Sequence, residues 1–258
     1  CLVQPDTLVR QVQQGEATLI DVRNAYEYTR YHVPNSLNVT SHAVKLKTHL
    51  RDQRIVLIND GFRERSTVRL CGELRQHGFQ QVFVLRGGLQ YWRDTGNQLI
   101  GKNISNDVMT SVSAVDLQRE HGNVRWAFVD ISSSSEMVEK GAGDELHNVI
   151  SMPLSAEARQ RLLYEDPPTG QEVTRLVNRL TDNIQQKMHA NGNVTMVLFN
   201  KDGEGLAPLV RLLRSAGMGD VFYLRGGRIA LETYQSHQVA LLNREPKSNR
   251  LRPCGGGV

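Results

Sequence analysis

Residues 82–88 read Val-Phe-Val-Leu-Arg-Gly-Gly, and residues 221–227 repeat them as Val-Phe-Tyr-Leu-Arg-Gly-Gly. An apolar run of β-branched and aromatic residues before two glycines predicts a buried strand that ends in a tight turn. The correspondence extends upstream, where Thr-Leu-Ile-Asp-Val at 18–22 is matched by Ala-Phe-Val-Asp-Ile at 127–131. A repeat this long indicates two duplicated domains and not a solenoid, whose units span about 20–50 residues.

Short β-branched runs alternate with helical segments in both copies. This alternation predicts an α/β fold with a parallel sheet that is covered on both faces. In the first copy we expect strands near 17–21, 36–39, 54–59 and 81–85, and helices near 6–14, 25–30, 42–50, 66–77 and 88–94. The predicted domains are 1–98 and 112–243, with a polar linker at 99–111 and a flexible tail at 244–258.

The second copy contains an insertion at about 155–192, part of which has a helical pattern. We expect this helix to pack on its own domain, and a surface for a partner or for the other domain is the alternative. Apolar residues recur at helical spacing at Val173, Leu176, Val177, Leu180, Ile184 and Met188, and Thr169 with Glu172 forms a capping-box sequence.

Composition excludes several classes of function. The net charge is +4, from 31 basic and 27 acidic residues, and the basic residues are not clustered as in a nucleic-acid binder, so no nucleic-acid partner is expected. No apolar run approaches the roughly 20 residues that cross a bilayer, so we predict no transmembrane segment. The three cysteines and eight histidines form no ligand pattern, so no metal or other cofactor is expected.

The cysteines bear on location. A chain that begins at Cys1 fits removal of a signal peptide, a bacterial lipid anchor on that cysteine, or trimming of the sequence. A disulfide between Cys1 and Cys254 would join the two ends. A periplasmic or exported location is favoured, with a cytoplasmic one as the alternative. We expect Cys71 to be a buried, inert thiol, because unpaired cysteines are among the most buried residues.

The first copy resembles the rhodanese superfamily over nearly all of residues 3–96. The resemblance implies that each domain is a mostly parallel five-stranded sheet flanked by helices. The second copy is degenerate, since Asp130 and Glu136 remain but Ser132 and Leu231 stand where the first copy has Arg23 and Trp92. The matching residues are Asp21-Val22-Arg23, Glu27, His32-Val33-Pro34-Asn35-Ser36-Leu37-Asn38, Gly78, Gly87-Gly88 and Trp92.

By the same resemblance, Asp21, Arg23 and Glu27 are scaffold residues. Bidentate bonds between arginine and carboxylate would tie the end of a strand to the neighbouring loops. A structural role is likewise expected for His32, Gly87, Gly88 and Trp92.

The resemblance also implies where the active-site loop lies. In that family a cysteine after the strand carries sulfur, and inward-pointing N–H groups at the start of the next helix hold the anion. Here the cysteine position is occupied by Asp60 or Asn59 in the first copy and by Asn200 or Lys201 in the second, so both loops lack the nucleophile. The predicted binding loops are Asn59, Asp60, Gly61, Phe62, Arg63, Glu64, Arg65 and Ser66, and Asn200, Lys201, Asp202, Gly203, Glu204 and Gly205.

The leading hypothesis is a non-catalytic module that binds or regulates through a small anion, a sulfur species or a protein partner. Arg63 and Arg65 would then make the first loop a receptor for an anion or an acidic side chain. An ion in this loop would identify a working receptor, whereas Asp60 folded against the loop amides would indicate a self-plugged pocket.

Two enzymatic alternatives remain open. One is a thiosulfate sulfurtransferase or sulfur-relay protein that uses Cys254, which lies in a basic tail near Arg250 and Arg252. The other is phosphatase-like loop chemistry with Asp60 as the nucleophile. It ranks last, because no metal-binding carboxylate cluster is evident beside Asp60 in the sequence.

Overall fold

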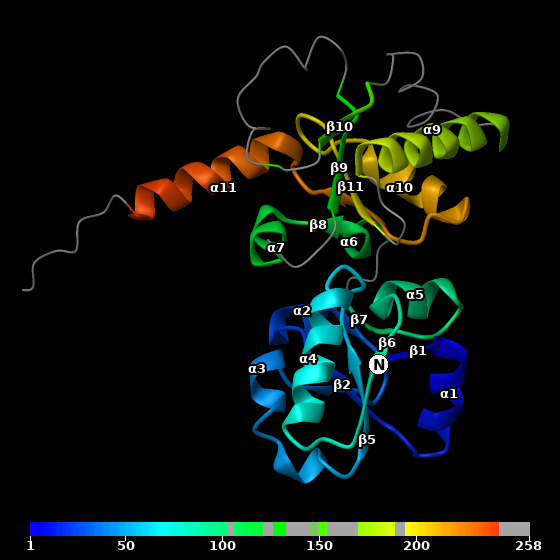
Figure 1. Cartoon of the computed structure of the whole chain (residues 1–258), viewed down its shortest axis with the longest axis vertical. Helices are drawn as coiled ribbons and strands as arrows, with labels where there is room; N and C mark the ends of the chain where they lie inside the picture. Colours follow the sequence, from blue (N-terminus) through cyan, green and yellow to red (C-terminus); the bar gives the residue numbers. More distant parts are fainter. Residues whose placement is uncertain are drawn as a thin grey trace, which may run out of the picture.

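The computed structural model describes residues 1–102, 106–120, 126–132, 146, 149–153, 170–188 and 194–242. The chain forms two α/β halves, each built on a five-stranded sheet (Figure 1). Every pair of neighbouring strands in the two sheets is parallel. The predicted fold class is therefore confirmed. Within the described ranges, the structure has no helix of the length and apolarity that crossing a membrane would require.

The first sheet has the strand order β1-β6-β5-β2-β4. These strands are β1 (Leu2–Val3), β6 (Gln81–Leu85), β5 (Arg54–Ile58), β2 (Thr18–Asp21) and β4 (Leu37–Asn38). Apolar clusters place α1 (Pro5–Gln13) and α5 (Gly88–Asp94) on one face and α3 (Ser41–Val44) and α4 (Glu64–Gln76) on the other. The half also contains α2 (Ala25–Arg30), the 3-10 helix η1 (Thr48–Leu50) and an antiparallel pair, β3 (Tyr31–His32) with β7 (Ile100–Gly101).

The second sheet has the order β10-β9-β11-β12-β8. Its strands are β10 (Val149–Ser151), β9 (Trp126–Asp130), β11 (Thr195–Phe199), β12 (Val221–Leu224) and β8 (Ser111–Val112). Helices α9 (Gly170–Met188) and α10 (Leu206–Ser215) cover one face, while α7 (Ala114–Arg119) and α11 (Gly227–Leu242) cover the other. The short α6 (Asn106–Met109) precedes β8.

The two halves share one topology. In chain order, β1, β2, β4, β5 and β6 of the first sheet hold the same places as β8, β9, β10, β11 and β12 of the second. Helix α10 follows β11 as α4 follows β5, and α11 follows β12 as α5 follows β6. This is the arrangement that the duplicated sequence predicts.

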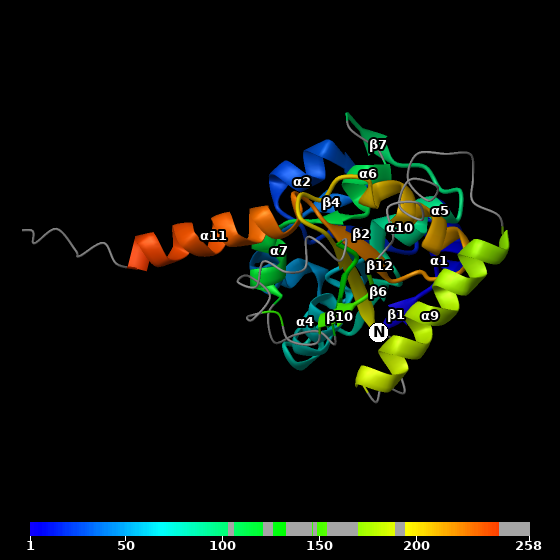
Figure 2. The same cartoon turned by 90° about the horizontal axis from the view of Figure 1, so that it is seen from above.

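The helix predicted in the insertion is α9. Its Leu176 and Leu180 are 6% and 1% exposed and pack with α10 and the second sheet, so the helix packs on its own domain as expected. Helix α11 extends away from the second half in both views (Figures 1 and 2). Outside the described residues lie Thr169, Glu136 and the tail with Cys254, as do the side chains of Glu172, Val173, Ile184 and Met188.

The segment predicted as a linker, 99–111, is built into both halves. Its Leu99 and Met109 are 9% and 3% exposed and belong to the core cluster of the first half. Gln90 in α5 donates a hydrogen bond from Nε2 to the Met109 carbonyl (2.8 Å). The described part of the linker is therefore anchored on the first half before the chain enters β8, and the boundaries at 98 and 112 remain predictions.

The cysteine pairing differs from the expectation. Cys1 and Cys71 form a disulfide with their Cα atoms 6.5 Å apart, which lies within the normal range for such bonds. Cys71 is fully buried in α4, but it is not a free thiol. Cys1 is not bonded to Cys254, and its sulfur cannot carry a lipid while this bond exists. The sequence could not reveal the pairing, because it depends on the parallel contact of β1 with β6.

Candidate functional site

The first loop, residues 59–66, leaves β5 and enters α4 on the side of the first half that faces the second (Figure 1). Phe62 in this loop is 4% exposed. Its ring meets the rings of Trp126 (4.5 Å between centroids) and Phe222 (5.3 Å) edge-on. Both partners belong to the second half, so Phe62 is part of the second half's core cluster.

Side chains of the first loop accept hydrogen bonds from the loop's own backbone N–H groups. The Gly61 N–H donates to Asn59 Oδ1 (2.6 Å), and the Arg63 N–H donates to Asp60 Oδ1 (3.0 Å). Nearby, the Gly87 N–H donates to a carboxylate oxygen of Glu64 (2.5 Å). An incoming anion would have to displace these internal acceptors, so the arrangement matches the self-plugged alternative.

Arg63 is held by three carboxylates. It makes a bidentate bond to Glu27 (3.1 and 2.9 Å) and an ion pair with Asp116 of the second half (2.7 Å). Asp60 Oδ2 lies 3.5 Å from Arg63 Nη1. The sequence predicted that Arg63 would receive an anion, but its guanidinium is already bonded to carboxylates of the chain. Arg65 also interacts with other groups of the chain. Asp116 is the partner that sequence inspection missed.

The pKa values of these groups reflect their burial and mutual contact. Burial raises the pKa of the Asp60 carboxyl, although Arg63 offsets part of this effect. The charge of Asp60 in turn raises the pKa of Arg63. Burial alone would raise the pKa of Asp116, but a hydrogen bond from Ser113 and the charge of Arg63 lower it overall. Arg63 and Asp116 thus stay ionised and join the loop to α7.

Asp21 and Arg23 lie beneath this loop. They form a bidentate ion pair, Nε to Oδ1 at 3.0 Å and Nη2 to Oδ2 at 2.7 Å, with almost no exposure. Arg23 Nη2 also donates to the Tyr31 carbonyl (2.6 Å). In the second half Asp130 Oδ1 accepts from the Ser132 N–H (2.9 Å), so the turn is kept without the guanidinium.

The other residues assigned a structural role make local contacts. Glu27 forms the capping box of α2 with Asn24. The His32 ring stacks on Tyr28 (3.9 Å), and its Nδ1 lies 2.8 Å from the Tyr28 carbonyl. Trp92 is 5% exposed and donates from Nε1 to the Gln98 carbonyl (2.9 Å).

The second loop, residues 200–205, follows β11. Asn200 is 4% exposed; its Oδ1 accepts from the Gly203 N–H (2.6 Å) and its Nδ2 donates to the Glu204 carbonyl (3.0 Å). Asp202 Oδ1 accepts from the Glu204 N–H (3.0 Å). Lys201, Asp202 and Glu204 are exposed. As in the first loop, two backbone N–H groups of this loop are bonded to its own side chains, but its charged side chains face solvent.

A glycine pair supports each loop from below. A Cβ on Gly88 would lie 2.2 Å from the Gly61 nitrogen and 2.5 Å from the Asn59 carbonyl oxygen, and its φ is +57°. A Cβ on Gly227 would lie 2.5 Å from the Asn200 carbonyl oxygen, and the φ of Gly227 is +55°. The repeated Gly-Gly therefore marks the place where the backbone passes directly against the loop.

Replacing Gly88 by alanine is expected to lower the free energy of unfolding by about 2–4 kcal/mol, from the positive φ and the clash with backbone atoms. The matched control is Gly72→Ala, because Gly72 lies inside α4 with no atom near its added Cβ. This control should raise stability by up to about 1 kcal/mol. Urea unfolding of both variants checks the prediction, and equal effects of the two substitutions would contradict it.

Comparison with known proteins agrees with this fold. Residues 4–95 match the family model described as Rhodanese-like domain. Residues 4–95 are therefore similar to rhodanese-like domains.

Relatives of this domain include sulfurtransferases. The thiosulfate sulfurtransferase GlpE of Pseudomonas savastanoi pv. phaseolicola is 27% identical over 94 residues, which are 35% of this chain and 86% of that protein. An uncharacterized protein of Buchnera aphidicola is 21% identical over 98 residues, 36% of this chain and 66% of that protein. Among solved structures, the 3-mercaptopyruvate sulfotransferase SseA of Escherichia coli is 15% identical, covering 88% of this chain and 98% of that chain with a TM-score of 0.31.

Proposed function

We propose that the chain is a tandem rhodanese-like protein that binds a ligand and does not transfer sulfur. The repeated topology supports a rhodanese-like origin for the second half as well. Asp60 and Asn200 stand where the resemblance implies a catalytic cysteine, and a carboxylate or a carboxamide cannot form a persulfide. The observation that carries the proposal is the first loop itself, whose Gly61 and Arg63 amides are bonded to Asn59 and Asp60 while Phe62 is buried against the other half.

This loop serves as a connector between the halves. Phe62 and Arg63 contact the second half as described above. Ser66 Oγ also donates a hydrogen bond to Glu120 of the second half (3.2 Å). On the far side of the junction, Arg214 bonds to Asp94 (2.6 Å). Phe62, Arg63 and Ser66 of this loop thus hold the two halves together. We therefore propose that the ligand binds in the space between the halves.

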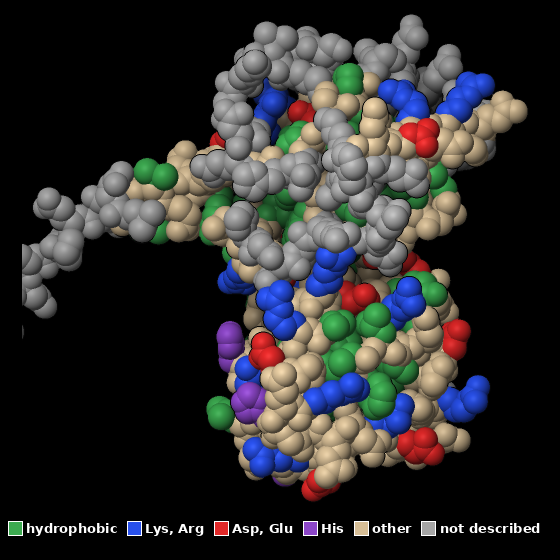
Figure 3. All heavy atoms as spheres, viewed as in Figure 1, with side chains coloured by type: hydrophobic (Ala, Val, Ile, Leu, Met, Phe, Trp, Pro, Cys, Tyr) green, Lys and Arg blue, Asp and Glu red, His purple; other side chains and the backbone are tan. Residues whose placement is uncertain are grey.

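The disulfide and the surface charges support a proposal for the protein's location and type of ligand. The Cys1–Cys71 disulfide favours an oxidising compartment, which supports a periplasmic or exported location. On the face shown in Figure 3, basic and acidic side chains are interspersed over the first half, and no basic stripe crosses it. That distribution favours a small ligand or a protein partner over nucleic acid.

A thiosulfate:cyanide sulfurtransferase assay on the purified chain tests the proposal. We expect turnover no higher than that of buffer, because neither loop provides a thiolate nucleophile. The matched variant is Cys254→Ser, which removes the tail cysteine and leaves the Cys1–Cys71 bond. Turnover that persists in this variant would overturn the proposal. Turnover that vanishes with Cys254 would instead identify a tail-based sulfur carrier, and mass spectrometry would then find one added sulfur on that residue.

A further inference from the structure

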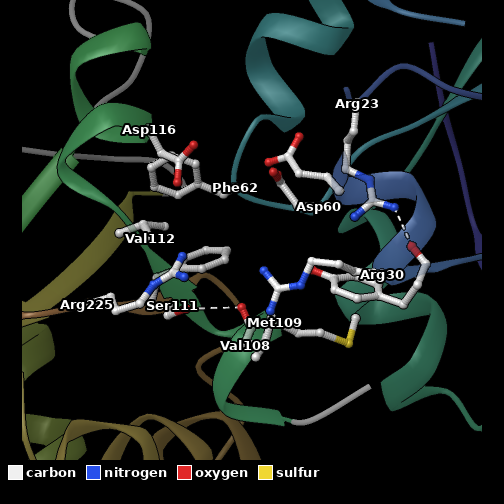
Figure 4. Close-up of a pocket in the computed structure, with 13 residues that line it drawn as sticks. Arg23, Arg30, Asp60, Phe62, Val108, Met109, Ser111, Val112, Asp116 and Arg225 are labelled. Atoms are coloured by element: carbon white, nitrogen blue, oxygen red, sulfur yellow. Dashed lines mark hydrogen bonds between the residues drawn. The ribbon is translucent and has the colours of Figure 1, made fainter. Parts of the chain in front are cut away.

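A small pocket of about 50 Å³ lies at the junction of the two halves. Arg30 and Tyr31 of the first half line it together with Ser111, Phe222 and Arg225 of the second. In Figure 4, Arg30 reaches into this space from one half and Arg225 from the other. The pocket exists only where the two halves meet.

In the part of the chain that the structure describes, the two arginines have no partner of opposite charge. Among the described residues, neither guanidinium takes part in a hydrogen bond or an ion pair, and the contact of Arg30 is the ring of Tyr26 at 5.7 Å. The Arg30 Nε is buried and has no hydrogen-bond acceptor. A buried donor without an acceptor is unfavourable, and two cations at one pocket repel each other. An anion between them would relieve both effects.

Three carboxylates on the opposite wall of the pocket do not pair with Arg30 or Arg225. Glu27 and Asp116 are bonded to Arg63, and Asp60 accepts from the Arg63 backbone. Burial also raises the pKa of Asp60, which favours its neutral form. Arg30 and Arg225 are left without a carboxylate partner among the described residues, so a small anion would pair with these two guanidinium groups.

We propose that this pocket binds one small oxyanion of the phosphate or sulfate type, held by Arg30 from the first half and Arg225 from the second. The inference rests on the proposed binding function and names its ligand class. The size of the pocket corresponds to about three to five water molecules, which suits an ion of four or five heavy atoms better than pyrophosphate. Guanidinium forks recognise such oxyanions through paired N–H donors.

Isothermal titration calorimetry with sodium phosphate and with sodium sulfate tests the site, at constant ionic strength maintained with sodium chloride. We expect saturable binding of one ion per chain. Arg30→Gln and Arg225→Gln should each weaken it about 10- to 100-fold, because each removes charge-assisted hydrogen bonds. Arg30→Lys and Arg225→Lys keep the charge but not the fork, so an intermediate loss is expected.

The matched control is Arg10→Gln, which removes the same charge from an exposed position on α1 and should leave binding unchanged. Absence of saturable binding would overturn the inference, as would equal binding by the wild type and both glutamine variants. Pyrophosphate bound as tightly as phosphate would contradict the size of the site. Thiosulfate bound with no binding of phosphate or sulfate would contradict the ligand class.

The two proposals fail in different ways. Sulfurtransferase turnover would overturn the proposed function while leaving the phosphate titration intact. If the chain shows no turnover and also fails to bind phosphate or sulfate, only the proposal of the oxyanion site is overturned. Far-ultraviolet circular dichroism of each variant confirms that the compared proteins are folded.

Discussion

Phe62→Ala is expected to lower the free energy of unfolding by about 3–5 kcal/mol, the usual loss when a buried phenylalanine is truncated. The loss should be this large although the residue lies in a loop, because its side chain is 4% exposed. The substitution removes two edge-on aromatic contacts, with Trp126 and Phe222, that no other residue of the first loop provides. It should therefore weaken the junction more than either half by itself.

Tryptophan fluorescence offers a direct measurement, because the chain has two tryptophans. Trp92 lies in the core of the first half and Trp126 in contact with Phe62. In a Trp92→Phe background, the emission of Trp126 should shift to longer wavelength when Phe62 is truncated, since water then reaches the indole. Urea unfolding followed at the same wavelength gives the change in stability.

The control for this prediction is Tyr26→Ala, an aromatic truncation at a position that is 72% exposed. It should change stability by no more than about 0.5 kcal/mol. If Phe62→Ala unfolds like the wild type and leaves the Trp126 emission unchanged, the loop does not dock on the second half, and its role as a connector is wrong.

The sequence predicted the sheets well, because strands and helices of ordinary length have clear periodicity. The repeated Val-Phe-Val/Tyr-Leu-Arg-Gly-Gly phrase correctly marked β6 with α5 and β12 with α11. The two-residue strands β1, β3 and β7 were not predicted, since two residues carry no pattern. The expected helix at 42–50 is divided into α3 and η1.

The site was predicted less completely, because its contacts join distant parts of the chain. Positions Asp60 and Asn200 were correctly located after β5 and β11. Phe62 was predicted only as part of the binding loop, and contacts with Trp126 and Phe222 of the second half make it a core residue. Arg63 likewise looked free until Asp116, 53 positions later in the sequence, was found beside it. Spacing along one loop contains no information about such partners.

The second large effect concerns the disulfide. Cys1→Ser should lower the free energy of unfolding by about 4 kcal/mol, because the bond closes a loop with a sequence separation of 70 residues and thereby restricts the unfolded chain. Cys1 is the better position to change, since it is exposed and a serine hydroxyl there stays hydrated. Cys71 is fully buried, so a serine at that site would add a separate desolvation penalty.

Thiol counting and unfolding together decide the pairing. The unfolded, unreduced protein should react as having one free thiol out of three cysteines, and wild type treated with dithiothreitol should become as unstable as Cys1→Ser. Cys254→Ser is the matched control, and it should leave stability unchanged while removing the remaining free thiol. If Cys254→Ser instead destabilises the protein as much as Cys1→Ser, then Cys1 is bonded to Cys254, and β1 is not fastened to α4 across the edge of the first sheet.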